Sequence, residues 1–295
     1  MRLLKLRNIL VATELDDAAL AAVVAASQLA GAAGASLHAV SVATSQDRQR
    51  ADGAGTTDGK AALAAILDRA GARADSKIYL LEGDSASAIG SLADELNADA
   101  IVLGPHRERE PGASALGSTA LAVVTSASSP CLVVATPFRL PLRRVLVPID
   151  LSDTARGALL VGLSWASALR AGPRENPTHA DVELTVLHVQ PPSRDGDASS
   201  LPHTLERELE YLGKESGTWA GVSIHGQTIV NADATQGIVD YVGENTWDLV
   251  VLGTRGLGLD PVGRLGSVTA SVMEVIAAPA LLVPPAVWMA HARMS

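Results

Sequence analysis

The chain has 295 residues, 47% of them hydrophobic and 19% charged, and it carries a formal net charge of −9 at pH 7. This length suggests about two domains, and this composition excludes a disordered chain. The acidic balance argues against nucleic acids or anionic membranes as partners, because neutralising their phosphates requires clustered lysine and arginine.

Two further features favour a soluble, cytoplasmic protein. The single cysteine, Cys131, cannot build a disulfide framework or a thiolate metal cluster, which is typical of a reducing compartment. Residues 18–46 carry no charged side chain, but Gly31 and Gly34 interrupt this stretch before it reaches the length of a membrane span. We therefore expect no transmembrane segment.

Short apolar runs alternate with helical stretches along the first part of the chain. We expect strands at residues 8–13, 36–42, 76–82, 100–104 and 131–135, and helices at 17–30, 60–71, 85–96 and 118–127. Such alternation predicts βαβ units around a parallel sheet. The near-continuous Val, Ile and Leu content of the strands suits burial on both faces of that sheet.

The same order recurs in the second part of the chain. We expect strands at residues 144–149, 183–189, 222–229, 249–253 and 280–284, and helices near 153–171, 201–214, 234–244 and 267–276. Residues 99–104 align with 248–253, and residues 129–134 align with 278–283, at one constant offset. Two copies of one fold therefore fit better than two unrelated domains.

These patterns predict two tandem α/β domains, each Rossmann-like and doubly wound, with a five-stranded parallel sheet flanked by helices. We place the domains at residues 1–138 and 139–295, because prolines punctuate the chain near the boundary. The last strand of each domain is apolar enough to aggregate as a bare edge. We therefore expect these two strands to pair within one chain.

A glycine-rich segment follows the fourth strand of the second copy. Gly253 and Gly256 allow a tight turn and the close approach of a ligand to the backbone. Gly266 and Ser267 open the last helix, where free amides and the helix dipole favour an anion, and Ser267 and Thr269 add hydroxyl donors. The pattern predicts a phosphate site that needs no lysine, although the same residues could simply turn the chain and cap the helix.

With these residues the whole chain resembles the universal stress proteins, in the form with two domains in one polypeptide. The nucleotide signature of that family is glycine, two residues, glycine, nine residues, and glycine followed by serine or threonine; the segment above matches it throughout. In ATP-binding members an acidic residue ending the first strand holds the adenosine, and a valine ending the second strand contacts adenine. The resemblance thus implies an ATP site, with or without Mg²⁺, formed by Pro148, Ile149, Asp150, Val189, Leu252, Gly253, Gly256, Gly266, Ser267, Val268 and Thr269.

The first copy departs from this signature. Arg107 replaces the second glycine, and Pro105 removes a backbone donor. Losing two charge-assisted hydrogen bonds would weaken phosphate binding by at least ~100-fold, unless Arg107 itself faces the phosphates. We expect a degenerate first site, empty or differently occupied, formed by Glu14, Val42, Gly104, Arg107, Gly117 and Ser118.

The resemblance implies an ATP-binding protein of the stress response that holds its nucleotide mainly in the second domain. A slow ATP hydrolase or phosphotransfer protein and a nucleotide-independent interaction scaffold remain as alternatives. No base to activate water stands out, so we expect neither an enzyme nor a catalytic residue. The histidines lack metal-ligand spacing, and His188 is expected on a strand face rather than as a ligand. A homodimer and an unidentified protein partner are both compatible with the sequence.

Overall fold

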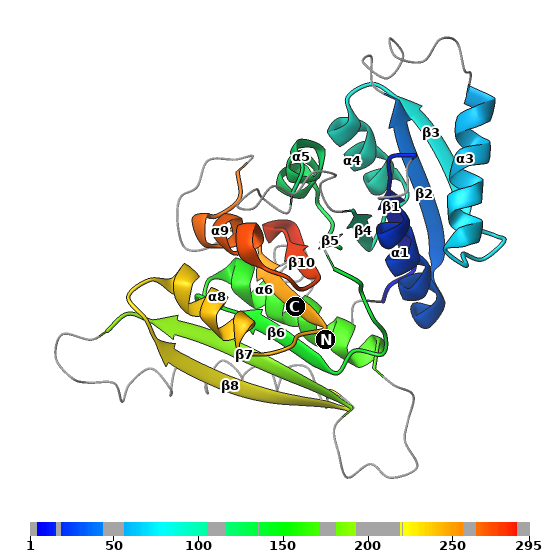
Figure 1. The fold of residues 1–295 in the computed structure, drawn as a ribbon. Helices are drawn as coiled ribbons and strands as arrows, with labels where there is room; N and C mark the ends of the chain where they lie inside the picture. The colour runs from blue at the N-terminus through cyan, green and yellow to red at the C-terminus, as the bar shows by residue number, and fades with distance from the viewer. Residues whose placement is uncertain are drawn as a thin grey trace.

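The computed structural model describes residues 5–15, 19–43, 56–104, 116–134, 136–170, 181–192, 219, 221–255 and 264–287. These residues form one ten-stranded sheet with the strand order β3-β2-β1-β4-β5-β10-β9-β6-β7-β8 (Figure 1). The order repeats about the centre of the sheet, because each half places its first strand between its second and fourth strands. The predicted pair of doubly wound α/β units is confirmed.

The first half follows the predicted order of elements. Its strands and helices are β1 (Asn8–Ala12), α1 (Leu20–Ala33), β2 (Ser36–Ala43), α3 (Thr56–Arg69), β3 (Lys77–Glu82), α4 (Ser85–Glu95), β4 (Ala100–Leu103), α5 (Ser118–Ser126) and β5 (Cys131–Val133). Helix α1 ends at Gly34, whose φ of 65° is the left-handed conformation that stops many helices. The Asp84 side chain caps α4 by accepting a hydrogen bond from the Ser87 amide.

The second half repeats this order. Its elements are β6 (Arg144–Pro148), α6 (Asp153–Ala168), β7 (Val182–Gln190), β8 (Val222–Val230), α8 (Ala234–Gly243), β9 (Leu249–Gly253), α9 (Ser267–Val275) and β10 (Ala280–Val283). The helix predicted near residues 201–214 lies outside the described residues. None of the described helices combines the length and apolarity required to cross a membrane.

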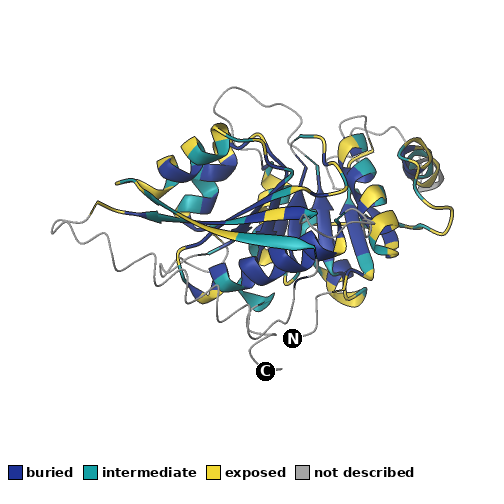
Figure 2. Ribbon diagram, turned by 90° about the horizontal axis from the view of Figure 1, so that it is seen from below, coloured by how far each residue is buried: buried dark blue, intermediate teal, exposed yellow. Residues whose placement is uncertain are grey.

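Helices cover both faces of the sheet, and each face has its own apolar core. Side chains of α1, α3 and α6 pack in one core, and those of α4, α5, α8 and α9 pack in the other. Strands β4, β5 and β10 are buried along their whole length. Figure 2 shows this arrangement, with buried strands at the centre and exposed residues on the outer sides of the helices. Each core contains residues of both halves, so the apolar interior is continuous across the chain.

The two halves join through their last strands, as the sequence predicts. β5 and β10 pair in antiparallel fashion, with Leu132 opposite Leu281 and Cys131 opposite Leu282 (Figure 1). The other strand pairs of this sheet are parallel. This pairing satisfies two apolar edges that would otherwise be templates for aggregation. Burial also raises the pKa of the Cys131 thiol to about 12.

The internal repeat extends to a hydrogen-bonded clamp at the amino ends of the strands. In the first half, Asp99 Oδ2 accepts hydrogen bonds from the amides of Arg7 and Asn8, at 2.7 and 2.9 Å. In the second half, Asp248 Oδ2 accepts bonds of the same two lengths from the amides of residues 143 and 144. Each carboxylate therefore ties the start of its half's fourth strand to the start of the first strand.

Candidate functional site

The predicted site lies at the carboxyl ends of β6 and β9. These two strands are neighbours, and they mark the point where the connections of the second half change direction along the sheet. Ligands of open α/β sheets bind at such a switch point. The residues that continue from β6 and from β9 therefore share one edge of the sheet.

One hydrogen bond ties the residue after β9 to β10, and two others bring together the two ends of the glycine segment. The Thr254 amide donates to Val283 O at 2.9 Å, and the Gly266 amide donates to Thr254 O at 2.8 Å. The Thr269 hydroxyl donates to Gly253 O at 2.7 Å. The last two bonds hold the start of α9 against the end of β9. Gly256 and the residues around it lie outside the described part of the chain.

The first turn of α9 has the features of an anion site. Its N-cap is Gly266, and within the described residues no side chain caps the helix. By contrast, Ser152 caps α6 and Asp233 caps α8. The amides of residues 267–269 belong to the first turn, where a helix offers no internal acceptor, and the dipole there favours negative charge. The exposed Ser267 side chain stands at this opening.

Two of the expected donors are engaged within the protein. The amide of Gly266 bonds to Thr254 O, so the available amides begin one residue later than the sequence suggests. The Thr269 hydroxyl is also committed, and its side chain is buried, at 6% exposed. In this structure Thr269 therefore holds α9 in place, and the donor that it can offer to a ligand is its backbone amide.

Gly253 is required by packing, apart from any role in binding a ligand. A Cβ at this position would lie 3.0 Å from Thr154 Cγ2 and 3.2 Å from Arg255 O. Thr154 lies in the first turn of α6 and is buried. The glycine thus lets the start of α6 approach the end of β9. This contact could not be predicted from the sequence, because Thr154 becomes a neighbour of Gly253 only through the fold.

The end of β6 forms a tight corner before α6. The Ile149 amide continues the strand ladder by donating to Leu187 O at 2.8 Å. Asp150 Oδ1 then accepts a hydrogen bond from the Ser152 amide at 3.0 Å, and Leu151 between them has a left-handed φ of 63°. The hydroxyl of Ser152 caps α6. This corner presents Asp150 at an exposed position at the carboxyl end of β6, the strand that pairs with β9.

The apolar members of the predicted site are buried or half-buried near the ends of the strands and at the start of α9. Pro148 and Leu252 are buried at the ends of β6 and β9. Val189, near the end of β7, is half-buried, and α8 lies directly over it. A Cβ at Gly237 of α8 would come within 2.9 Å of Val189 Cγ1, so a glycine is needed there. Val268 is half-buried and packs against the same apolar core as Val189 and Leu252.

His188, which the sequence predicts on a strand face, contacts this corner. His188 Nδ1 lies 3.0 Å from Ile149 O. Because a carbonyl oxygen only accepts, Nδ1 carries the proton and donates in this hydrogen bond. The strand register, which the sequence does not reveal, is what brings the ring to the end of β6.

The first half keeps the framework of the site. Glu14 is exposed after β1, Val42 is half-buried on β2, and Gly117 is the N-cap of α5 without a side-chain cap from the described residues. Ser118 follows it at an exposed position. A Cβ at Gly104 would be 3.7 Å from its nearest neighbour, an ordinary contact, so packing does not demand that glycine. Arg107 lies outside the described residues.

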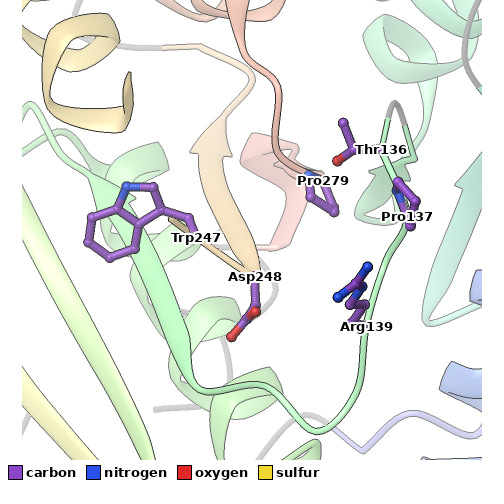
Figure 3. A pocket seen from close by; sticks show the side chains of 6 residues that line it. All are labelled: Thr136, Pro137, Arg139, Trp247, Asp248 and Pro279. Carbon is purple, nitrogen blue, oxygen red and sulfur yellow. The ribbon is translucent and has the colours of Figure 1, made fainter. Parts of the chain in front are cut away.

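A pocket of about 220 Å³ opens at the amino ends of the strands in the second half, opposite the predicted site (Figure 3). It lies where β9 and β10 begin, beside the segment that connects the halves, and is lined by Thr136, Pro137, Arg139, Trp247, Asp248 and Pro279. Trp247 is held by the Arg144 guanidinium, which lies 4.8 Å from the ring centre. Among the described residues, no group of His, Cys, Asp and Glu could hold a metal ion.

Comparison with known proteins places both halves in one family. Residues 5–135 and 141–284 each match the universal stress protein family. A universal stress protein of Synechocystis sp. is 34% identical over 143 residues, which are 48% of this chain and 85% of that protein.

Solved structures share the fold of the whole chain. A universal stress protein from Archaeoglobus fulgidus superposes with a TM-score of 0.68 at 17% identity, covering 94% of this chain and 98% of its own. A functionally unknown protein from Pseudomonas aeruginosa has a TM-score of 0.62 at 17% identity, covering 98% and 96%. At this identity the likeness concerns the fold alone. With two matched domains in one polypeptide, the chain belongs to the universal stress protein family, in its tandem form.

Proposed function

We propose that this protein binds an adenine nucleotide, ATP in the first instance, in its second half, and that it acts in stress adaptation in the cytoplasm. One observation carries the proposal: α9 begins at Gly266 without a side-chain cap from the described residues, and its start is held against Gly253 at the switch point of the sheet. An uncapped helix start at this position is suited to a phosphate group.

We match each part of the nucleotide to described residues. The backbone amides of residues 267–269 would donate to the phosphates, which explains how a site without lysine can hold a polyanion. Asp150 would accept hydrogen bonds from the adenosine, and Val189 and Leu252 would lie beside the base. When phosphates are present they can recruit Mg²⁺, which commonly keeps several waters and few protein ligands.

We further propose that occupancy, and not turnover, is the output of this site. The described residues supply backbone donors and the Asp150 carboxylate, but no side chain at the start of α9 that would activate water. The nucleotide-bound and empty forms would then differ in their affinity for another protein. Phosphate release by the purified protein at a rate above the buffer background would overturn this part of the proposal.

The decisive experiment is calorimetric titration of the full chain with ATP, followed by ADP and AMP to rank the nucleotides. We expect binding that is lost in Gly256→Arg, a change that copies the residue of the first half. Absence of binding heat in the wild-type protein, or unchanged affinity in Gly256→Arg, would refute a site in the second half. Identification of small molecules released on denaturation tests independently which ligand the protein carries.

A further inference from the structure

We propose that His188 is a positioning residue for the nucleotide site: its Nδ1–H group fixes the corner that presents Asp150. The inference rests on the proposed function, because it concerns the same site. Its first support is the contact between His188 Nδ1 and Ile149 O, at 3.0 Å. Ile149 is buried, at 9% exposed, and the backbone carbonyls of buried residues are normally hydrogen-bonded.

The imidazole acts where the strand ladder ends. The paired register of β6 and β7 runs from Arg144–Glu183 to Pro148–Leu187. One residue further, the Ile149 amide still bonds to Leu187 O, and the His188 side chain holds the Ile149 carbonyl. Both polar groups of the Ile149 backbone are therefore tied to β7 immediately before the chain turns.

The corner needs this restraint because its backbone is strained. Leu151 has a φ of 63°, a left-handed conformation that is unfavourable for a residue with a Cβ. The Asp150 carboxylate takes part in the turn by accepting from the Ser152 amide. If the Ile149 carbonyl is released, the corner can relax, and the carboxylate moves with it.

The first half offers an internal comparison. Ala12 pairs with Val40, as Pro148 pairs with Leu187, so Ser41 occupies the position of His188. The Thr13 amide bonds to Val40 O at 3.0 Å, which repeats the ladder bond of Ile149. The ladder is thus common to both halves, whereas the imidazole belongs to the half that keeps the complete glycine signature.

The test compares two amide side chains of different reach. In His188→Asn the amide nitrogen takes the place of Nδ1, and in His188→Gln it is displaced toward the place of Nε2. We expect ATP affinity to stay within about threefold of wild type in the first and to fall about five- to tenfold in the second. His225→Asn is the matched control, because that exposed histidine lies on β8 and bonds to Ser223.

A second readout does not need nucleotide. In the free protein, ¹⁵N-histidine NMR at a pH where the ring is neutral should show His188 as the Nδ1–H tautomer, which a donor to a carbonyl requires. The Nε2–H tautomer, equal affinities for the Asn and Gln variants, or a comparable loss in His225→Asn would overturn the inference. Failure of the wild-type protein to bind any adenine nucleotide would refute the proposed function and this role with it. ATP binding that His188→Gln leaves unchanged would refute this role alone.

Discussion

Replacing Ser267 by aspartate should separate the stability of α9 from its ability to bind phosphate. Ser267 is exposed and is the first residue of a helix that has no side-chain cap from the described residues. A carboxylate there interacts favourably with the helix dipole, which adds about 0.3–1 kcal/mol to stability. The same charge would stand where the phosphates are expected, so stability and nucleotide affinity should change in opposite directions.

The size of the loss follows from Coulomb's law. Two unit charges about 5 Å apart near a protein surface repel by about 3 kcal/mol at an effective dielectric constant of about 20. Solvent and salt at this exposed position reduce the repulsion, and we expect about 1.4–2 kcal/mol to remain, or a ten- to thirtyfold weaker affinity for ATP. The effect should shrink as the salt concentration rises.

Calorimetry with ATP and chemical denaturation of the same samples measure both quantities. Ser267→Asn isolates the charge, because it changes the side chain without adding a carboxylate. Ser118→Asp is the matched control, since Ser118 is also exposed and begins α5, a helix with a glycine N-cap and no side-chain cap from the described residues. This control should gain the same stability and keep its ATP affinity. Unchanged affinity in Ser267→Asp, or an equal loss in Ser118→Asp, would refute the assignment of phosphates to α9.

Three further predictions concern stability and reactivity. Gly253→Ala should lower the free energy of unfolding by about 1–2 kcal/mol, because its Cβ would lie 3.0 Å from Thr154 Cγ2. Gly104→Ala should leave it nearly unchanged. Urea denaturation compares the two variants, and equal losses of stability would contradict the packing argument. Asp248→Ala removes two charge-assisted hydrogen bonds and should cost about 2–3 kcal/mol in the same assay, a loss below 0.5 kcal/mol being inconsistent with the clamp. Burial raises the pKa of the Cys131 thiol from 9.0 to about 12, so stability should fall as pH rises above 9, where the unfolded thiol ionises and the folded one does not. At pH 8 a thiol reagent should modify Cys131 only at the rate of unfolding, and fast modification of the folded protein would refute its burial.

The sequence was sufficient to predict the repeat, the parallel sheets and the pairing of the last strands. Each of these depends on a local pattern: apolar runs at strand spacing, glycines at fixed offsets, and two apolar strands that need partners. The glycine start of α9 was predictable for the same reason. In such cases the feature depends on residues that are close together in the sequence, so it can be predicted without knowing the tertiary contacts.

The finer assignments required three-dimensional neighbours. Thr269 was expected to donate to a ligand, but its hydroxyl reaches Gly253 O, sixteen positions earlier in the chain. His188 was expected on a strand face, and only the register of β6 and β7 shows that its ring meets Ile149 O. A hydroxyl or imidazole has several possible partners in a sequence, and the packing of elements decides among them.

The antiparallel contact of β5 and β10 determines which surfaces other molecules can reach. Because each half is internally parallel, this contact directs the carboxyl ends of the first half's strands to one rim of the sheet and those of the second half to the opposite rim. A nucleotide at the rim of the second half would therefore leave the other rim uncovered. Two identical single domains joined in this way would display two equivalent rims. The tandem chain has a complete glycine signature in one half only, so its two rims differ chemically. A partner protein could therefore bind one rim selectively.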